Sequence, residues 1–173
     1  EPTFISGKHI LRRAVWGEGR WVAVGDRGRR ATSKDGLAWE DDPKTAPTDA
    51  MIDVAFGAGV FVGVGLHGLR MTTRDGLTWE NRVVGEEGEH LNSVVWAENR
   101  FVAPGVGATY ESPDGFAWKR TPNQNAPQTL VFGSGVFVGA KWKGRILRST
   151  DGIAWEEVHR AERHVEAVGY ATL

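Results

Sequence analysis

Four aspartates stand in nearly the same eight-residue setting, and each could serve as an acid or as a metal ligand. The four stretches read SKDGLAWE, TRDGLTWE, SPDGFAWK and STDGIAWE, and they begin at residues 33, 73, 112 and 149. A hard-cation site needs several converging oxygen ligands, whereas each of these aspartates is alone in its turn. We therefore expect each aspartate to accept backbone N–H hydrogen bonds inside a turn, with the following glycine supplying the unusual backbone dihedral angles. The structural residues of the four copies are Ser33, Asp35, Gly36, Trp39, Thr73, Asp75, Gly76, Trp79, Ser112, Asp114, Gly115, Trp118, Ser149, Asp151, Gly152 and Trp155.

A second group of candidates lies in short loops, mostly of the form G-x-x-G, that recur once in each repeat. A basic pocket is one interpretation of these loops, with Trp142 as a stacking platform for a sugar ring or another planar ligand. Solvated charges, balanced by acidic connections such as Glu40 to Asp42, are the other interpretation. Trp142 is the only tryptophan outside a repeated position, so the packing of the repeats does not require it. The candidate ligand-binding residues are Arg27, Arg29, His67, Arg70, Lys141, Trp142, Lys143 and Arg145.

The five histidines show no spacing typical of a metal site. His90 and His164 occupy equivalent repeat positions, which favours a structural role. No P-loop, dinucleotide or G-x-S-x-G signature occurs. We expect no metal, no cofactor and no catalytic residue.

The elements that must position these residues form a repeat of about 40 residues. The motif tryptophans follow one another at spacings of 40, 39 and 37 residues, a period found in four-stranded propeller blades. Each unit reads as an apolar strand, a tight hairpin, a second strand, a short loop, a third strand, the DG motif and a fourth strand carrying the tryptophan. The other repeated tryptophans, at 16, 21 and 96, are also expected in the core. The pattern predicts an all-β protein of the β-propeller type, built from four-stranded antiparallel blades.

The motif S/T-x-D-G-x-x-W resembles the Asp-box, or bacterial neuraminidase repeat, over residues from about 9 to 173. The commoner Asp-box has one more residue between Asp and Trp, so all four turns here are one residue tighter. The resemblance implies a propeller of the kind found in bacterial surface and secreted proteins, and therefore an extracellular or cell-surface location. It also implies that the motif aspartates form turns.

The single predicted domain covers 1–173, with blades at about 9–48, 49–89, 90–127 and 128–163. Residues 164–173 match the first strand of a fifth blade, and residues 1–8 are a possible extra strand. Rings of this family commonly have six to eight blades. Three arrangements stay open: a small closed ring, a ring completed by a second chain as in a homodimer, or a part of a longer polypeptide.

The bulk composition excludes several classes of protein. The chain has 173 residues, a formal net charge of −1 and no cysteine, which excludes disulfides and thiolate metal sites. No apolar run reaches the length of a membrane span, and a near-neutral charge is untypical of nucleic-acid binding. The chain begins at Glu1 with no signal peptide ahead of it, as expected for a processed chain or an excised piece.

Sialidases also use Asp-box propellers, and the resemblance invites a search for their catalytic groups. They need an arginine triad, a tyrosine nucleophile with a glutamate partner, and an aspartate acid. Tyr110 and Tyr170 are the only tyrosines, and both fall at strand positions typical of packing residues. The F/Y-R-I-P signature is absent; GRIL at 144–147 is the nearest sequence. We therefore expect a non-catalytic binding or assembly module with a glycan or protein partner. The alternative is a fragment or half of a larger sialidase-like glycoside hydrolase propeller.

Overall fold

The computed structural model describes residues 9–41 and 49–171, and it shows four four-stranded antiparallel sheets. In every sheet the strands neighbour one another in chain order. Blade 1 contains β1 (Leu11–Gly17), β2 (Arg20–Gly25), β3 (Arg30–Ser33) and β4 (Glu40–Asp41); blade 2 contains β5 (Met51–Gly57), β6 (Val60–Gly65), β7 (Arg70–Thr73) and β8 (Glu80–Val83). Blade 3 contains β9 (Val95–Ala97), β10 (Arg100–Gly105), β11 (Ala108–Ser112) and β12 (Lys119–Pro122); blade 4 contains β13 (Thr129–Gly133), β14 (Val136–Lys141), β15 (Arg145–Ser149) and β16 (Glu156–Arg160).

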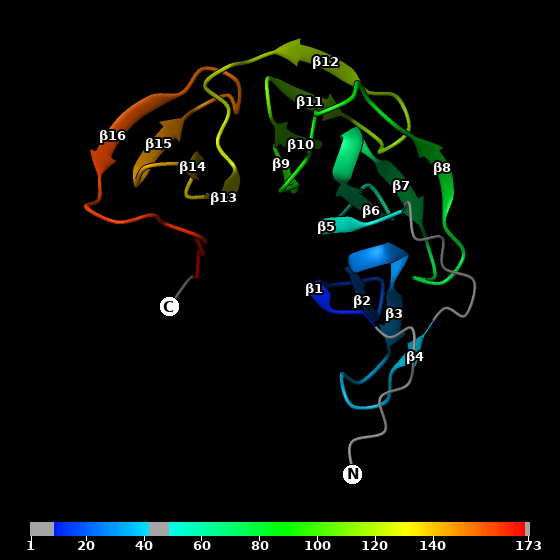
Figure 1. Cartoon of the computed structure of the whole chain (residues 1–173). Coiled ribbons are helices and arrows are strands. Elements are labelled where there is room, and N and C mark those ends of the chain that lie inside the picture. Colours follow the sequence, from blue (N-terminus) through cyan, green and yellow to red (C-terminus); the bar gives the residue numbers. More distant parts are fainter. Residues whose placement is uncertain (1–8, 42–48, 172–173) are drawn as a thin grey trace.

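The four blades follow one another along an open arc (Figure 1). The first strands, β1, β5, β9 and β13, line the inner side of the arc, and the fourth strands lie on its outer side. The chain after β16 turns back toward the inner side. The all-β prediction and the four-stranded blades are confirmed, and the sheets do not close into a ring. The predicted extra strand at 1–8 lies outside the described residues.

A two-residue hairpin turn joins the first and second strands of each blade, and both turn residues have positive φ. In blade 1 these residues are Glu18 (φ 47°) and Gly19 (φ 72°), and in blade 3 they are Glu98 (φ 49°) and Asn99 (φ 59°). This is the geometry of a type I′ turn, whose twist matches that of the flanking strands. In blades 2–4 the aromatic residue of the second strand packs in a cluster shared with the preceding blade, which is why Phe61, Phe101 and Phe137 are fully buried.

Small residues at the ends of the first strands set how closely neighbouring blades pack. A side chain at Gly17 would collide with the ring of Phe56 in the next blade, and one at Gly57 would collide with Trp96. Each aromatic side chain therefore covers a residue of the preceding blade that has no side chain. This contact explains the alternation of aromatic and small residues in the repeated segments.

The first blade has no described blade in front of it, so its aromatic face is open. Trp16 is 48% exposed and Trp39 is 41% exposed, whereas Phe56 and Trp79, at the same positions of blade 2, are partly buried. The prediction that all repeated tryptophans lie in the core is therefore wrong for Trp16 and Trp39. The physical reason is that no described sheet covers this face of blade 1, because the repeated segments of blades 1 and 2 have similar sequences.

Residues 164–170 take the place of the first strand of a fifth blade but form no ladder with another strand. A side chain at Gly133 would collide with the ring of Tyr170, as one at Gly57 would with Trp96. The Tyr170 hydroxyl also lies 3.0 Å from the Ser134 hydroxyl. The last described segment therefore packs on blade 4 in the way that each blade packs on the one before it.

The four DG motifs form the same hydrogen-bonded turn, shown here for the first copy. Ser33 Oγ accepts from the N–H of Gly36 (2.9 Å), and Asp35 Oδ1 accepts from the N–H groups of Leu37 (2.8 Å) and Ala38 (2.9 Å). Trp39 Nε1 donates to the carbonyl oxygen of Gly36 (3.0 Å). The turn-forming role expected for the aspartates matches this geometry. The tryptophan, however, precedes the fourth strand instead of lying on it, because its ring folds back over its own turn.

Candidate functional site

The connections of each blade divide into two faces. Arg20, beside the first hairpin, donates to the carbonyl oxygen of Asp75 in the next DG motif (2.8 Å), so hairpins and motif turns share one face. On the other face, the N–H of Gly85 in an inter-blade connection donates to the carbonyl oxygen of His67 in a short loop (2.8 Å). We call this second face the loop face. It carries the sequence positions that vary most from blade to blade.

A pocket of about 240 Å³ opens on the loop face between blades 3 and 4. Its apolar walls include Val106, Ala126, Pro127 and Trp142, and we call it the Trp142 pocket. The indole of Trp142 is 60% exposed, although an aromatic ring of this size is normally buried. Its polar walls are Asn92, Gln124, Gln128 and Lys141. A site of this kind suits an apolar or planar group with a few hydrogen-bonding atoms.

Two contacts hold the loop that carries Trp142. The Trp142 ring packs against the imidazole of His164, with ring centroids 4.6 Å apart. The Lys141 ammonium donates to the carbonyl oxygen of Gln124, and burial lowers the pKa of Lys141 from its ordinary value. Lys143 takes a positive φ of 65°, as Arg27 and His67 do in the loops of blades 1 and 2. The loop therefore has the same positive-φ residue as the loops of blades 1 and 2, and its aromatic side chain is the feature that does not recur in them.

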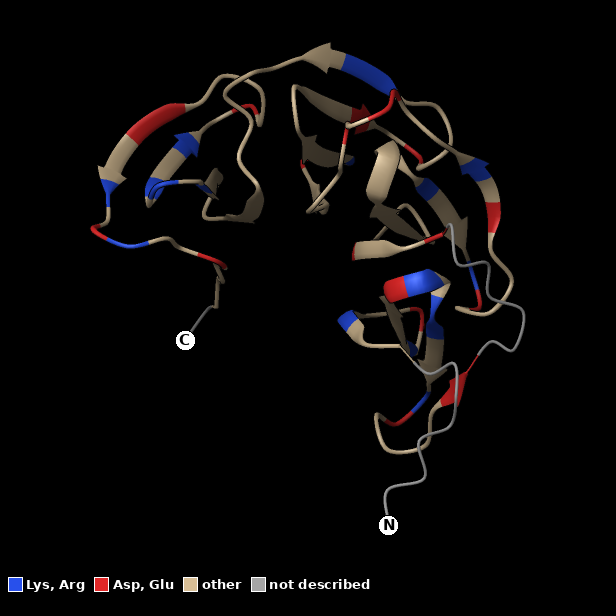
Figure 2. Ribbon diagram, in the orientation of Figure 1, with Lys and Arg blue, Asp and Glu red and all other residues tan. Residues whose placement is uncertain are grey.

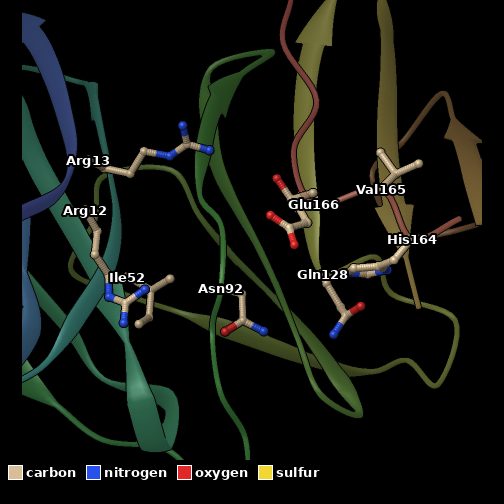
Figure 3. Close-up of a pocket in the computed structure, with 9 residues that line it drawn as sticks. Arg12, Arg13, Ile52, Asn92, Gln128, His164, Val165 and Glu166 are labelled. Atoms are coloured by element: carbon tan, nitrogen blue, oxygen red, sulfur yellow. The ribbon is translucent and has the colours of Figure 1, made fainter. Parts of the chain in front are cut away.

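A larger cavity of about 460 Å³ lies on the inner side of the arc (Figure 3). Five of its lining residues occupy one equivalent position of successive repeats, just before or near the start of each first strand. These residues are Arg12, Ile52, Asn92, Gln128 and Glu166. We call it the inner cavity. It adjoins the Trp142 pocket, since Asn92 and Gln128 line both.

The basic wall of the inner cavity is held by two aspartates. Arg12 Nε donates to Asp26 Oδ1 (2.5 Å), and its Nη2 donates to Oδ2 (3.3 Å). Arg13 Nε lies 3.5 Å from Oδ1 of Asp53. Burial raises the pKa of Asp53, although hydrogen bonds from the Val94 N–H and the Ser93 hydroxyl to its Oδ2 act in the opposite direction. Asp53 thus links blade 3 to the arginine of blade 1.

The basic loop residues do not converge on one pocket. Arg29 donates to the carbonyl oxygen of His9 (2.6 Å) and to Asp41 (3.4 Å), and Arg145 Nε donates to Glu157 (2.6 Å). Arg27 and His67 are exposed in the short loops of blades 1 and 2, and neither lines the Trp142 pocket. Figure 2 shows basic and acidic residues interspersed over all four blades. Of the predicted residues, only Lys141 and Trp142 line the pocket between blades 3 and 4.

Arg70 takes an interior position between blades 2 and 3. It is 5% exposed, and its guanidinium lies over the ring of Tyr110, 4.3 Å from the ring centroid. Tyr110 donates to Glu89, which also binds Arg120. These are the residue types of a sialidase nucleophile and its partners, so this cluster is the strongest catalytic candidate in the described residues.

Three observations favour a structural role for the Tyr110 cluster. Tyr110 is 3% exposed and Glu89 is 6% exposed, which leaves no access for a substrate. Burial, followed by the Glu89 carboxylate, raises the pKa of Tyr110, whereas an activated nucleophile needs a lowered pKa. The joint between blades 1 and 2 repeats the arrangement: Arg30 (3.1 Å) and Arg82 (2.7 Å) both bind the buried carboxylate of Asp49.

Within 9–41 and 49–171, no group of three or more His, Asp or Glu side chains could hold a metal ion. No helix in this part of the chain is long and apolar enough to cross a bilayer. The sequence prediction missed the inner cavity and the two amides that connect it to the Trp142 pocket. An alignment of the repeats would have placed Asn92 and Gln128 at one position, which is the signal that could have found them.

No protein-family model matches the chain, and no curated protein matches it. Solved structures do match, and they are β-propeller proteins. A structure of YCF48 bound to D1 peptide has a TM-score of 0.65 at 18% identity, covering 81% of this chain and 51% of that one. Virginiamycin B lyase from Staphylococcus aureus has a TM-score of 0.69 at 9% identity, covering 83% and 53%. The GH74 enzyme of Niastella koreensis has a TM-score of 0.58 at 19% identity, covering 86% and 24%.

These comparisons define the class: the chain has a β-propeller fold. Because the identities are below 20%, these comparisons establish the fold and nothing else about the chain. The chain spans about half the length of YCF48 and of the lyase.

Proposed function

We propose that the chain is a non-catalytic binding or assembly module that presents the Trp142 pocket to a segment of a partner protein. The observation that carries this proposal is the exposure of the Trp142 indole (60%) above a mainly apolar pocket. Exposed aromatic side chains beside a pocket are typical of contact sites between proteins. A module of this kind needs no cofactor and has no catalytic residue.

The dimensions and chemistry of the pocket support a peptide partner. A volume of about 240 Å³ accommodates roughly one large side chain, and the amides of Asn92, Gln124 and Gln128 offer donors and acceptors around it. Among the fold neighbours, YCF48 has been solved bound to D1 peptide. The comparison supports a peptide-binding role for a propeller of this general form.

A glycan is the second candidate ligand, because Trp142 could stack on a sugar ring. The alternative function is a part of a larger glycoside hydrolase propeller, to which the GH74 neighbours and the resemblance to the Asp-box repeat both point. Under this alternative the catalytic groups would come from outside the described residues, since the Tyr110 cluster is buried.

Three finer proposals accompany this function. The DG motifs resemble the Asp-box repeats, and this resemblance supports an extracellular or cell-surface location in a bacterium. The open face of blade 1, with Trp16 and Trp39 exposed, supports association with a second copy. We propose no interaction with nucleic acid.

The experiment that tests the proposed function compares the wild-type chain with Trp142→Ala and Arg27→Gln. Each is screened against a peptide array and a glycan array. Trp142→Ala should lose the ligands that the wild type retains, whereas Arg27→Gln should bind like the wild type, because Arg27 lies outside the pocket. Retention of every ligand by Trp142→Ala would refute the proposal. Loss of glycans instead of peptides would favour the second candidate.

A further inference from the structure

The Trp142 pocket and the inner cavity share two amide side chains, those of Asn92 and Gln128. Both residues directly line the inner cavity in Figure 3, and they come from the equivalent position of adjacent repeats. The two hollows therefore adjoin at these two side chains. We call them together the groove, with Trp142 at its loop-face end and Arg13 at its inner end.

The shared walls have the chemistry of a peptide group. The side-chain amide of Asn or Gln carries a donor and an acceptor, as each peptide unit does. Two such amides along one groove can pair with successive peptide groups of an extended chain. Asn92 is half-buried, and it is preceded by the fully buried Leu91, which anchors the strand entrance. The backbone at Asn92 is therefore held by the sheet framework.

The inner end of the groove offers a guanidinium. The Arg13 side chain is 49% exposed, and its Nε lies 3.5 Å from the buried Asp53 carboxylate. Figure 3 shows the guanidinium extending into the cavity, with Glu166 on the opposite wall. A guanidinium has five N–H donors and can bind a carboxylate in a bidentate manner. Arg12, in contrast, already makes two hydrogen bonds to Asp26.

We propose that this groove binds an extended peptide with an apolar side chain in the Trp142 pocket and a carboxylate at Arg13. The inference rests on the proposed function and adds the direction and the sequence pattern of the ligand. Asn92 and Gln128 bind the peptide backbone between the two ends. The Glu166 carboxylate repels an acidic group from the opposite wall, so the acid is directed to the Arg13 end.

The test begins with selection of random heptapeptides, displayed on phage, against the purified full chain. Enriched peptides are synthesised with fluorescent labels, and their affinities are measured by anisotropy for the wild type and for four variants. The variants are Trp142→Ala, Arg13→Gln, the double change Asn92→Ala with Gln128→Ala, and the control Arg27→Gln. Enriched peptides should combine one apolar residue with one carboxylate. Thermal unfolding verifies that each variant is folded, and Arg13→Ala, which also removes the charge, replaces Arg13→Gln if that variant is not.

The expected loss is roughly tenfold for Arg13→Gln, because a charge-assisted hydrogen bond is removed. A similar loss is expected for the double amide variant, and little change for Arg27→Gln. Raising the salt concentration should weaken the wild type more than Arg13→Gln. Peptides with free and amidated C-termini distinguish the two sources of the carboxylate, a terminus or an acidic side chain.

The outcomes separate the two proposals. If affinity depends on Trp142 but not on Arg13 or the amides, the groove is refuted while the proposed function stands. If no peptide is enriched, or if affinity is independent of Trp142, both are refuted.

Discussion

Tyr170 lies against the bare Cα of Gly133, and its hydroxyl is 3.0 Å from that of Ser134. The same aromatic-on-glycine contact joins Trp96 to Gly57 and Phe56 to Gly17. The segment 164–170 is therefore held by the contact that holds whole blades together, although it has no sheet of its own. Tyr170 attaches the end of this segment, and the contact of His164 with Trp142 attaches its start.

We predict that Tyr170→Ala releases this segment. A half-exposed aromatic ring contributes less than a buried one, so the expected cost is about 1–2 kcal/mol, concentrated in the last residues. Hydrogen exchange measured by mass spectrometry should show faster exchange at 164–170 and unchanged exchange in blades 1–3. Gly133→Val should have the same effect, since its side chain would displace the ring. Unchanged exchange in both variants would contradict the packing described here.

A matched pair of glycines tests how tightly the DG motifs pack between blades. Gly36 (φ 77°) and Gly76 (φ 80°) occupy the same position, and alanine in a left-handed conformation costs about 1–2 kcal/mol at either. At Gly36 the nearest atom to an added Cβ is 3.5 Å away, whereas at Gly76 Val22 and Thr32 lie 2.8 and 2.9 Å away. Gly76→Ala should therefore be more destabilising by about 1–3 kcal/mol in urea unfolding. Equal losses would contradict this inference.

The hydrogen bonding of the motif aspartates predicts that the folded protein loses stability in acid. Hydrogen bonds from the N–H groups of Phe116 and Ala117 lower the pKa of Asp114 below its ordinary value. A carboxylate whose pKa is lower in the folded state stabilises the fold above its unfolded-state pKa, and this contribution is lost as the pH falls through the folded-state pKa. Asp114→Asn keeps a side-chain oxygen but does not titrate. The unfolding free energy should fall less between pH 5 and pH 2 for this variant than for the wild type.

The control for the Asp114 measurement is the same variant at pH 7. There Asp114→Asn should unfold cooperatively with a loss of about 1 kcal/mol, because neutral acceptors form weaker hydrogen bonds. Parallel pH dependence of the two proteins would contradict the prediction.

The Tyr110 cluster is predicted to affect stability and not activity. Tyr110→Phe removes one hydrogen bond to Glu89 and should cost about 1 kcal/mol. Glu89→Ala leaves Arg120 without its buried carboxylate partner and should cost about 3 kcal/mol. Chemical denaturation measures both. A Tyr110→Phe protein of unchanged stability that had lost a hydrolytic activity of the wild type would reverse the assignment.

The open face of blade 1 gives a prediction about mass in solution. Association through this face should give a species of twice 18.9 kDa in sedimentation equilibrium. Trp16→Glu should return it to a monomer, because Trp16 is 48% exposed on that face. Trp142→Ala, on another surface, serves as the control. A monomer at all concentrations would exclude self-association.

The repeat made most of the fold predictable, since the sequence around each DG motif determines its own turn. Hairpins, motif turns and the two faces depend on residues close together in the chain. The exposure of Trp16 and Trp39 could not be predicted from their local sequences, because it depends on whether another sheet covers blade 1. The same limit applies to Arg70, whose burial depends on Glu89 in the connection to blade 3 and on Tyr110 in blade 3.

The site was predictable only in part. Trp142 was identifiable because it breaks the repeat, and Lys141 because it is adjacent. The amides of Asn92 and Gln128 looked ordinary, since their significance comes from the side-by-side placement of two blades. Arg145 was expected in a pocket but pairs with Glu157, a partner that only the register of β15 and β16 reveals.

The arginine–carboxylate joints described above differ along the arc. Asp49 and Glu89 join blades 1, 2 and 3, whereas the equivalent position before blade 4 is the uncharged Asn125, and Asn123 instead donates to the carbonyl oxygen of Ile153 (2.8 Å). The chain should therefore not open as a uniform stack. Blades 1–3 should behave as one cooperative unit, and blade 4 should open from it first during partial unfolding. The Trp142 pocket lies across that weaker joint between blades 3 and 4. A ligand bound there would therefore stabilise the joint and make the opening of blade 4 less favourable.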